Sequence, residues 1–171
     1  DETSGTVAHD SSGLSNNASL VNFPATGNPW VPGVVGNAIQ MNTATNDLGL
    51  YDDQVLTDNP IVLTNSDQFS FAFWCKSGFG AGVSPINPRF ISPWTITHWI
   101  LWRSGAGVGI WDNIPPMQQP NTDWHHYVVV YDRAAQRYSV AVDGVVVAYQ
   151  VPVLGTNQKV EPGDVQWSIG Y

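Results

Sequence analysis

Aspartate and glutamate side chains are the residues that, in a suitably spaced pair, could hydrolyse a glycosidic bond. A retaining glycosidase needs two carboxyl groups about 5 to 5.5 Å apart, one kept protonated and one ionised as the nucleophile. Glu2 and Glu161 are the only glutamates, one near the amino terminus and one in a Pro-Gly turn. Asp52 and Asp53 are adjacent, so on a strand they would point to opposite faces. The sequence therefore predicts a protein that is not an enzyme.

Histidines are the second group that could carry chemistry. His125 and His126 are neighbours, and neighbours on a strand face opposite ways, so they cannot chelate one ion together. We expect one of them inside the fold or at a sheet edge and the other near the surface. His9 and His98 are isolated, and no histidine spacing matches that of a zinc site.

A polar loop near the amino terminus has the oxygen chemistry that calcium prefers. Asp10-Ser11-Ser12-Gly13, followed by Asn16 and Asn17, supplies carboxylate, amide and backbone oxygens, and Ca²⁺ takes about six to eight such ligands. Asp10 and Asn16 are the candidate metal ligands. The alternative is an Asx-type turn without a metal, because Asp, Ser and Asn close turns through their own side chains.

The composition limits the classes of partner. The 171 residues suit one domain, with 43% hydrophobic and 12% charged residues and a net charge of −8. Such a negative chain would repel a phosphate backbone, so we expect no nucleic-acid partner. The sequence contains no stretch of about 20 apolar residues, so we expect no insertion into a membrane. Cys75, the only cysteine, lies in an apolar run and is predicted to be a buried, inert thiol.

Short runs rich in Val, Ile, Phe, Tyr and Trp recur between Gly, Pro and Asn clusters, and no long run has a helical period. The pattern predicts an all-β antiparallel sandwich. Asp143-Gly144 between two β-branched runs predicts a type I′ hairpin turn. We expect irregular loops over Gly78–Pro93 and Ile114–Thr122. The expected strands are Phe69–Trp74, Trp99–Trp102, Val108–Trp111, Trp124–Tyr131, Arg137–Val142 and Val145–Gln150.

Six motifs follow one another in a familiar order: Asp1–Thr6, Asp10–Gly13, Trp30–Met41, Phe69–Trp74, Asp123–Asp132 and Val142–Gly144. Together they resemble the laminin-G-like, concanavalin-A-like lectin/glucanase superfamily, in its bacterial and viral jelly-roll branch. The resemblance spans nearly the whole chain. It implies two curved antiparallel sheets, frequent calcium binding, and a binding role for glycans or proteins on the concave face or rim loops. Many members are modules of larger surface proteins, and some are enzymes. The acidic strand of the glucanases, with two glutamates and an aspartate at alternate positions, is missing here.

The sequence departs from this family at both ends. The apolar strand that normally precedes the Asp1 motif and the acidic strand that normally follows Trp167–Gly170 are absent. Their loss would leave long unpaired sheet edges, which folded proteins avoid. We therefore expect an excerpt of a longer protein, or neighbouring domains or chains that supply these strands.

The eight tryptophans divide into two groups. Trp30, Trp74, Trp124 and Trp167 lie in or beside the shared motifs and are predicted to fill the core. The others, Trp94, Trp99, Trp102 and Trp111, lie on or beside the middle strands, where an exposed indole could stack on a sugar ring. More core or interface aromatics are the alternative. The candidate ligand-binding residues are Trp102, Arg103, Trp111, Asn113, Gln118 and Gln119.

Two functions fit these observations. The first is a non-catalytic glycan-binding or adhesion module of a larger protein that is extracellular or displayed on a cell or virion surface, with carbohydrate or another surface protein as partner. The second is a structural or decorating domain of a virus particle or surface layer, held by protein contacts. A glycoside hydrolase would require three acids converging in one cleft.

Overall fold

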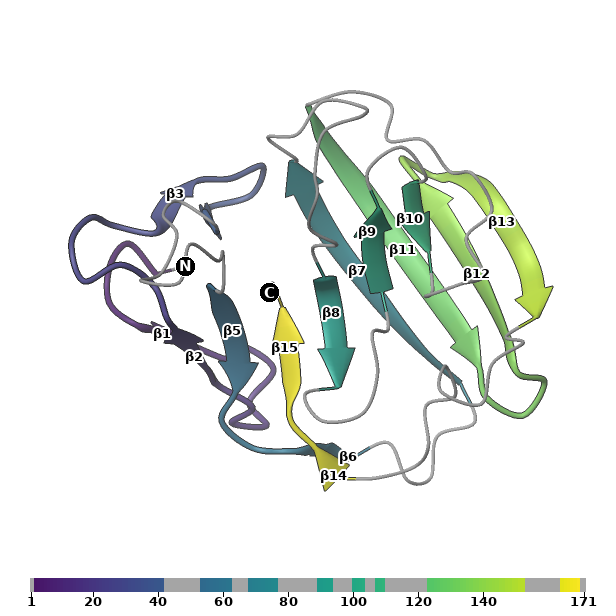
Figure 1. The fold of residues 1–171 in the computed structure, drawn as a ribbon, viewed down its shortest axis with the longest axis horizontal. Helices are drawn as coiled ribbons and strands as arrows, with labels where there is room; N and C mark the ends of the chain where they lie inside the picture. The colour runs from purple at the N-terminus through teal and green to yellow at the C-terminus, as the bar shows by residue number, and fades with distance from the viewer. Residues whose placement is uncertain are drawn as a thin grey trace.

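The computed structural model describes residues 2–41, 53–62, 68–76, 89–93, 100–103, 107–109, 123–152 and 164–169. These residues form 15 strands and no helix. Figure 1 shows most of the strands in two sheets, one holding β7, β11, β12 and β13 and the other holding β1, β2, β5, β15 and β8. The protein is an antiparallel β-sandwich, as the sequence predicts. No helix in the described part of the chain is long and apolar enough to cross a membrane.

The four-stranded sheet contains the longest strands and follows the order β13-β12-β11-β7. Its pairings are antiparallel, and β11 pairs with β7 over nine residues. Apolar side chains alternate with polar or small ones, so one face is buried and the other meets water. The strands are β7 (Gln68–Lys76), β11 (Trp124–Asp132), β12 (Arg137–Val142) and β13 (Val145–Pro152).

The second sheet has seven shorter strands in the order β1-β2-β5-β15-β8-β9-β10. They are β1 (Val7–Ala8), β2 (Ala18–Val21), β5 (Gln54–Thr57), β15 (Trp167–Ile169), β8 (Arg89–Pro93), β9 (Ile100–Arg103) and β10 (Gly107–Gly109). Two separate pairs complete the fold: β3 (Trp30–Pro32) with β4 (Asn37–Ile39), and β6 (Ile61–Val62) with β14 (Asp164–Val165).

Trp167 connects the two sheets. It lies on β15 of the seven-stranded sheet, is 2% exposed, and belongs to one core cluster with residues of β11, β12 and β13. Its ring centroid lies 5.0 Å from that of Phe71 and 6.2 Å from that of Phe69, both on β7. Aromatic packing across the interface therefore holds the layers together.

The hairpin between β12 and β13 confirms the predicted turn. Asp143 and Gly144 have φ angles of 50° and 78°, and Val142 pairs with Val145 on either side of them. Both central residues of a type I′ turn need positive φ, which explains this dipeptide at the tip.

One expectation about the strands requires correction. Gly78–Pro93 was expected to be irregular, but β8 occupies its last five residues and pairs with β15 and β9. Pro88 precedes β8 and Pro93 is its last residue, so neither lies in the interior of the strand, where a proline would remove a ladder hydrogen bond. Loss of the two end strands was expected to leave long unpaired edges; among the described strands, β15 pairs with β5 and β8, and β1 stands at the end of the order. Of the expected strands Trp99–Trp102 and Val108–Trp111, the described residues lie in β9 and β10, which also include Arg103 and Gly107.

Candidate binding face

The outward side of the four-stranded sheet, here called the outer face, carries an exposed aromatic residue. Along β7 the exposure alternates strictly, with Phe69, Phe71 and Phe73 turned toward the core. Trp74 takes the opposite side and is 45% exposed. The expectation that Trp74 fills the core is therefore wrong, because the period of two that buries the phenylalanines directs its indole to solvent.

Trp74 is paired with a histidine on the neighbouring strand. His126 of β11 is its direct partner in the register, and the two ring centroids lie 5.1 Å apart with an interplanar angle of 40°. His126 is half-buried, while His125, the previous residue, is 7% exposed on the core side. The expectation that the two histidines face opposite ways is confirmed.

The surroundings of this aromatic pair are small, apolar or polar. Ala72 is the next outer-face residue along β7 and pairs with Val128, and Val130 beyond it is 41% exposed. At the far end of the face, Gln68 Nε2 donates to Asp132 Oδ2 at 3.0 Å. Trp124 is half-buried on the same face, opposite Lys76. The expectation that it fills the core is therefore wrong.

A hydrogen-bonded turn fixes the backbone beneath His126. Asp143 Oδ2 lies 2.6 Å from His125 Nδ1, and Asp143 Oδ1 accepts the backbone N–H of His126 at 2.9 Å. The hydrogen bond from His125, followed by that from His126, holds the pKa of Asp143 below its ordinary value. The hairpin tip is thereby tied to β11 at the position of the aromatic pair.

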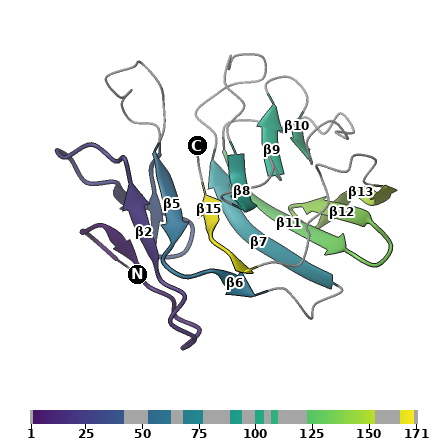
Figure 2. The same ribbon diagram turned by 60° about the horizontal axis from the view of Figure 1, so that its bottom comes forward.

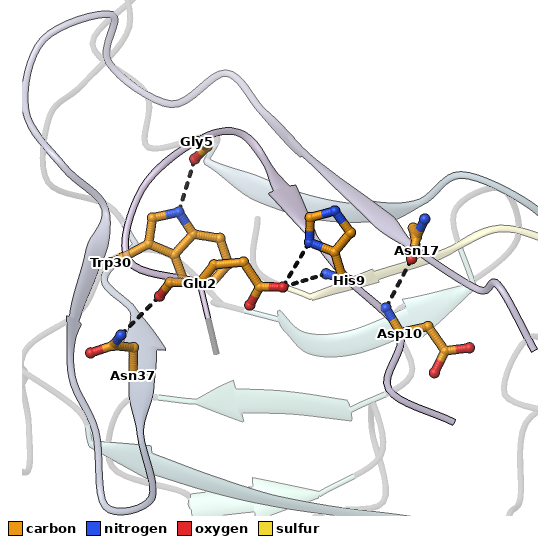
Figure 3. A network of polar contacts seen from close by, with 7 residues as sticks. All are labelled: Glu2, Gly5, His9, Asp10, Asn17, Trp30 and Asn37. Atoms are coloured by element: carbon orange, nitrogen blue, oxygen red, sulfur yellow. Dashed lines mark hydrogen bonds and ion pairs between the residues drawn. The ribbon is translucent and has the colours of Figure 1, made fainter. Parts of the chain in front are cut away.

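A second polar network surrounds the amino-terminal segment (Figure 3). Glu2 Oε1 accepts the backbone N–H of His9 at 2.9 Å and lies 2.9 Å from His9 Nδ1. These contacts, led by the His9 backbone, lower the pKa of Glu2 to about 2. Trp30 Nε1 donates to the Gly5 carbonyl at 2.8 Å, and Trp30 is 8% exposed, so its predicted burial is confirmed. Glu2 thus joins a network that fastens the chain end, and Glu161 lies outside the described residues.

The carboxylate of Asp10 is surrounded by donors of its own loop. It accepts Ser12 N at 2.8 Å, Ser12 Oγ at 2.7 Å and Asn16 N at 2.9 Å, and the Ser12 hydroxyl is the main cause of its lowered pKa. This is the arrangement of the metal-free turn, with N–H and O–H groups directed at the oxygens that Ca²⁺ would use. Within the described ranges no group of three His, Cys, Asp or Glu side chains could hold a metal ion. Calcium at Asp10 and Asn16 stays a prediction, which a calcium titration of the wild type and Asp10→Ala would test.

The candidate ligand-binding residues chosen from sequence are placed only in part. Trp102 and Arg103 lie in β9, where they pair with Val108 and Gly107 of β10. The predictions for Trp111, Asn113, Gln118 and Gln119 fall outside the described residues. Trp74 and His126 were missed, although the polar Gln68, Ser70 and Lys76 at alternate positions of β7 mark the outer face as solvent-exposed.

In comparisons with known proteins, no family model matches the chain and no curated protein matches its sequence. The resemblance to the laminin-G-like superfamily therefore remains a prediction based on the motifs quoted above. The antiparallel sandwich itself rests on the strand pairings and the shared core.

Proposed function

We propose that this chain is a non-catalytic glycan-binding or adhesion module, and that its outer face around Trp74 and His126 contacts a sugar ring. The supporting observation is the half-exposed indole of Trp74, paired with His126 at 5.1 Å. The C–H face of a pyranose is apolar and stacks on such a ring, while polar groups at the margin accept or donate hydrogen bonds. The module would belong to a larger secreted or surface protein.

The position of Trp74 within a paired strand favours the outer face over a loop as the binding surface. Trp74 lies within a nine-residue strand that pairs along its full length with β11. The ring is therefore held in position before a ligand arrives, which lowers the entropic cost of binding. Ala72 beside it leaves room for a flat ligand across the strand.

A glycan array probed with the wild type and three variants tests the proposal. We expect Trp74→Ala to weaken binding of any glycan that the wild type retains by roughly five- to 150-fold, if a sugar ring stacks about as strongly as a nucleic-acid base, whose stacking on one aromatic side chain contributes roughly 1 to 3 kcal/mol. Tyr149→Ala removes another exposed aromatic, 76% exposed and on β13, and is the matched control. Trp102→Ala tests the site chosen from sequence. Absence of any bound glycan, or loss of binding with Trp102→Ala alone, would refute the assignment to the outer face.

A structural or decorating domain held by protein contacts is the second candidate. It is favoured by a row of exposed apolar side chains on β13, where Val145, Val146 and Tyr149 are 64%, 60% and 76% exposed. A buried interface of about 1,000 Å² or more in an assembly would support this candidate over a free lectin.

A further inference from the structure

The outer face carries a positive charge at the end where Trp74 lies. Lys76, the last residue of β7, is exposed and takes the same side as Trp74, two residues before it. Its partner in the register is Trp124, the first residue of β11, and the partner of Trp74 is His126. Because β7 and β11 run side by side (Figure 2), these four residues form one surface, here called the Lys76 patch.

The acidic groups of the described residues leave Lys76 without a counter-charge on this surface. Asp132 is on the outer face but pairs with Gln68, at the other end of the two strands. The nine residues of β7 put Gln68 and Lys76 roughly 26 Å apart, well beyond the Debye length of about 8 Å at physiological salt. Asp123, which precedes Trp124, forms no ion pair with Lys76, and no other described carboxylate does.

The carboxylate of Asp143, near His126, is held by other groups. Its Oδ2 lies 2.6 Å from Nδ1 of His125 on the core side, and its Oδ1 accepts the backbone N–H of His126 at 2.9 Å. Within the described ranges, neither the ring nitrogens of His126 nor the ammonium of Lys76 hydrogen-bonds a protein group. An anion over the Lys76 patch would therefore meet an ammonium and a ring N–H.

We propose that the sugar ring bound on this face carries a carboxylate, as a uronic or sialic acid does, and that Lys76 binds this carboxylate while Trp74 stacks on the ring. The inference rests on the binding function proposed above. Lys76 lies two residues along the strand from Trp74, roughly 7 Å, and the flexible stem of lysine lets the ammonium reach the rim of a stacked ring. The net charge of −8 does not prevent this contact, because charges beyond a Debye length are largely screened.

Equilibrium binding to matched glycans tests the inference. The probes are oligosaccharides that end in glucuronate, galacturonate or sialate, each beside its carboxyl-reduced form, in which a hydroxymethyl group replaces the carboxylate. The wild type should bind at least one acidic form roughly two- to fivefold more tightly than its reduced form, the range expected of an exposed ion pair. Lys76→Gln should remove this preference and Lys76→Arg should retain it, while Trp74→Ala should weaken binding of both forms.

Arg133→Gln is the matched control, because it removes one positive charge from the turn after β11, at the end of that strand away from Trp124. Its preference for the acidic form should equal that of the wild type, and circular dichroism of each variant checks that it is folded. An equal loss of preference in Arg133→Gln and Lys76→Gln would overturn the inference, since net charge rather than position would then decide binding.

The remaining outcomes separate this inference from the proposed function. A wild type that binds acidic and reduced forms equally, or only neutral glycans, would overturn the role of the carboxylate and leave glycan binding at Trp74 standing. A preference that survives in Lys76→Gln would do the same. A sulfated glycan without a carboxylate that depends on Lys76 more than any acidic probe does would also overturn the choice of carboxylate. A wild type that binds no glycan at all would remove both proposals.

Discussion

Replacing the two tryptophans at positions 167 and 74 by leucine should have very different effects on stability. Trp167 is 2% exposed and contacts Phe69 and Phe71 across the two sheets. Complete truncation of a core tryptophan costs about 3 to 5 kcal/mol, and leucine keeps part of the buried volume, so Trp167→Leu should cost about 3 kcal/mol. Trp74 is 45% exposed and its ring contacts that of His126, so the same change there should cost less than about 1 kcal/mol.

Urea unfolding followed by far-ultraviolet circular dichroism measures both values, since tryptophan fluorescence would itself change with the substitutions. With a denaturant dependence of about 2 kcal/mol per molar, Trp167→Leu should lower the midpoint by roughly 1.5 M and Trp74→Leu by less than about 0.5 M. A domain of ordinary stability, about 5 to 15 kcal/mol, remains folded after either change. Equal midpoint shifts would refute the conclusion that Trp167 connects the sheets while Trp74 lies outside the core.

Three further predictions concern the turn, the thiol and the carboxylate of Asp143. Gly144→Ala should cost about 1 kcal/mol by urea unfolding, because its φ of 78° is strained for alanine although no atom lies within 4 Å of the added carbon; an unchanged midpoint would contradict the turn. Burial raises the pKa of the Cys75 thiol from 9.0 to about 12, so a thiol reagent at neutral pH should meet about a thousandfold less thiolate in the native protein than in urea, and equal rates would contradict this burial. The lowered pKa of Asp143 means that the folded state binds its proton less tightly than the unfolded state, so its stabilisation is present above pH 3.8 and is lost as the pH falls through the folded pKa. Asp143→Asn should reduce the change of the urea midpoint between pH 5 and pH 2. A variant whose midpoint depends on pH as the wild type's does would contradict the role of the carboxylate.

Local chemistry explains which parts of the fold could be predicted from sequence. Asp143 and Gly144 identify their own turn, since few other residue pairs tolerate two positive φ angles. The strands around them follow from alternation over six to nine residues, and Tyr138 and Val140 are buried on the expected face. No information from distant parts of the chain is needed for these assignments.

Pairing between distant strands could not be predicted in the same way. Ser168 of β15 pairs with Leu56 on one side and Ser92 on the other, and no local signal in the sequence specifies such partners. The strand β8 was missed because prolines were interpreted as loop residues, whereas Pro88 precedes the strand and Pro93 is its last residue. The exposure of Trp74 was missed for a different reason: the alternation was visible in the sequence, but membership of a shared motif was interpreted as burial.

The position of Trp74 follows from the burial of its neighbours on β7. Sliding the register of β7 by one residue would bury Gln68 and Lys76 and expose Phe69, Phe71 and Phe73. Each phenylalanine gains about 1.5 to 3 kcal/mol from burial, more than one half-exposed indole could recover. The three phenylalanines therefore fix the strand, and the fold would accept a small polar residue at position 74 without loss of the core. Because folding does not require a large aromatic ring there, the binding role proposed for Trp74 can be tested by mutation while the sandwich stays intact.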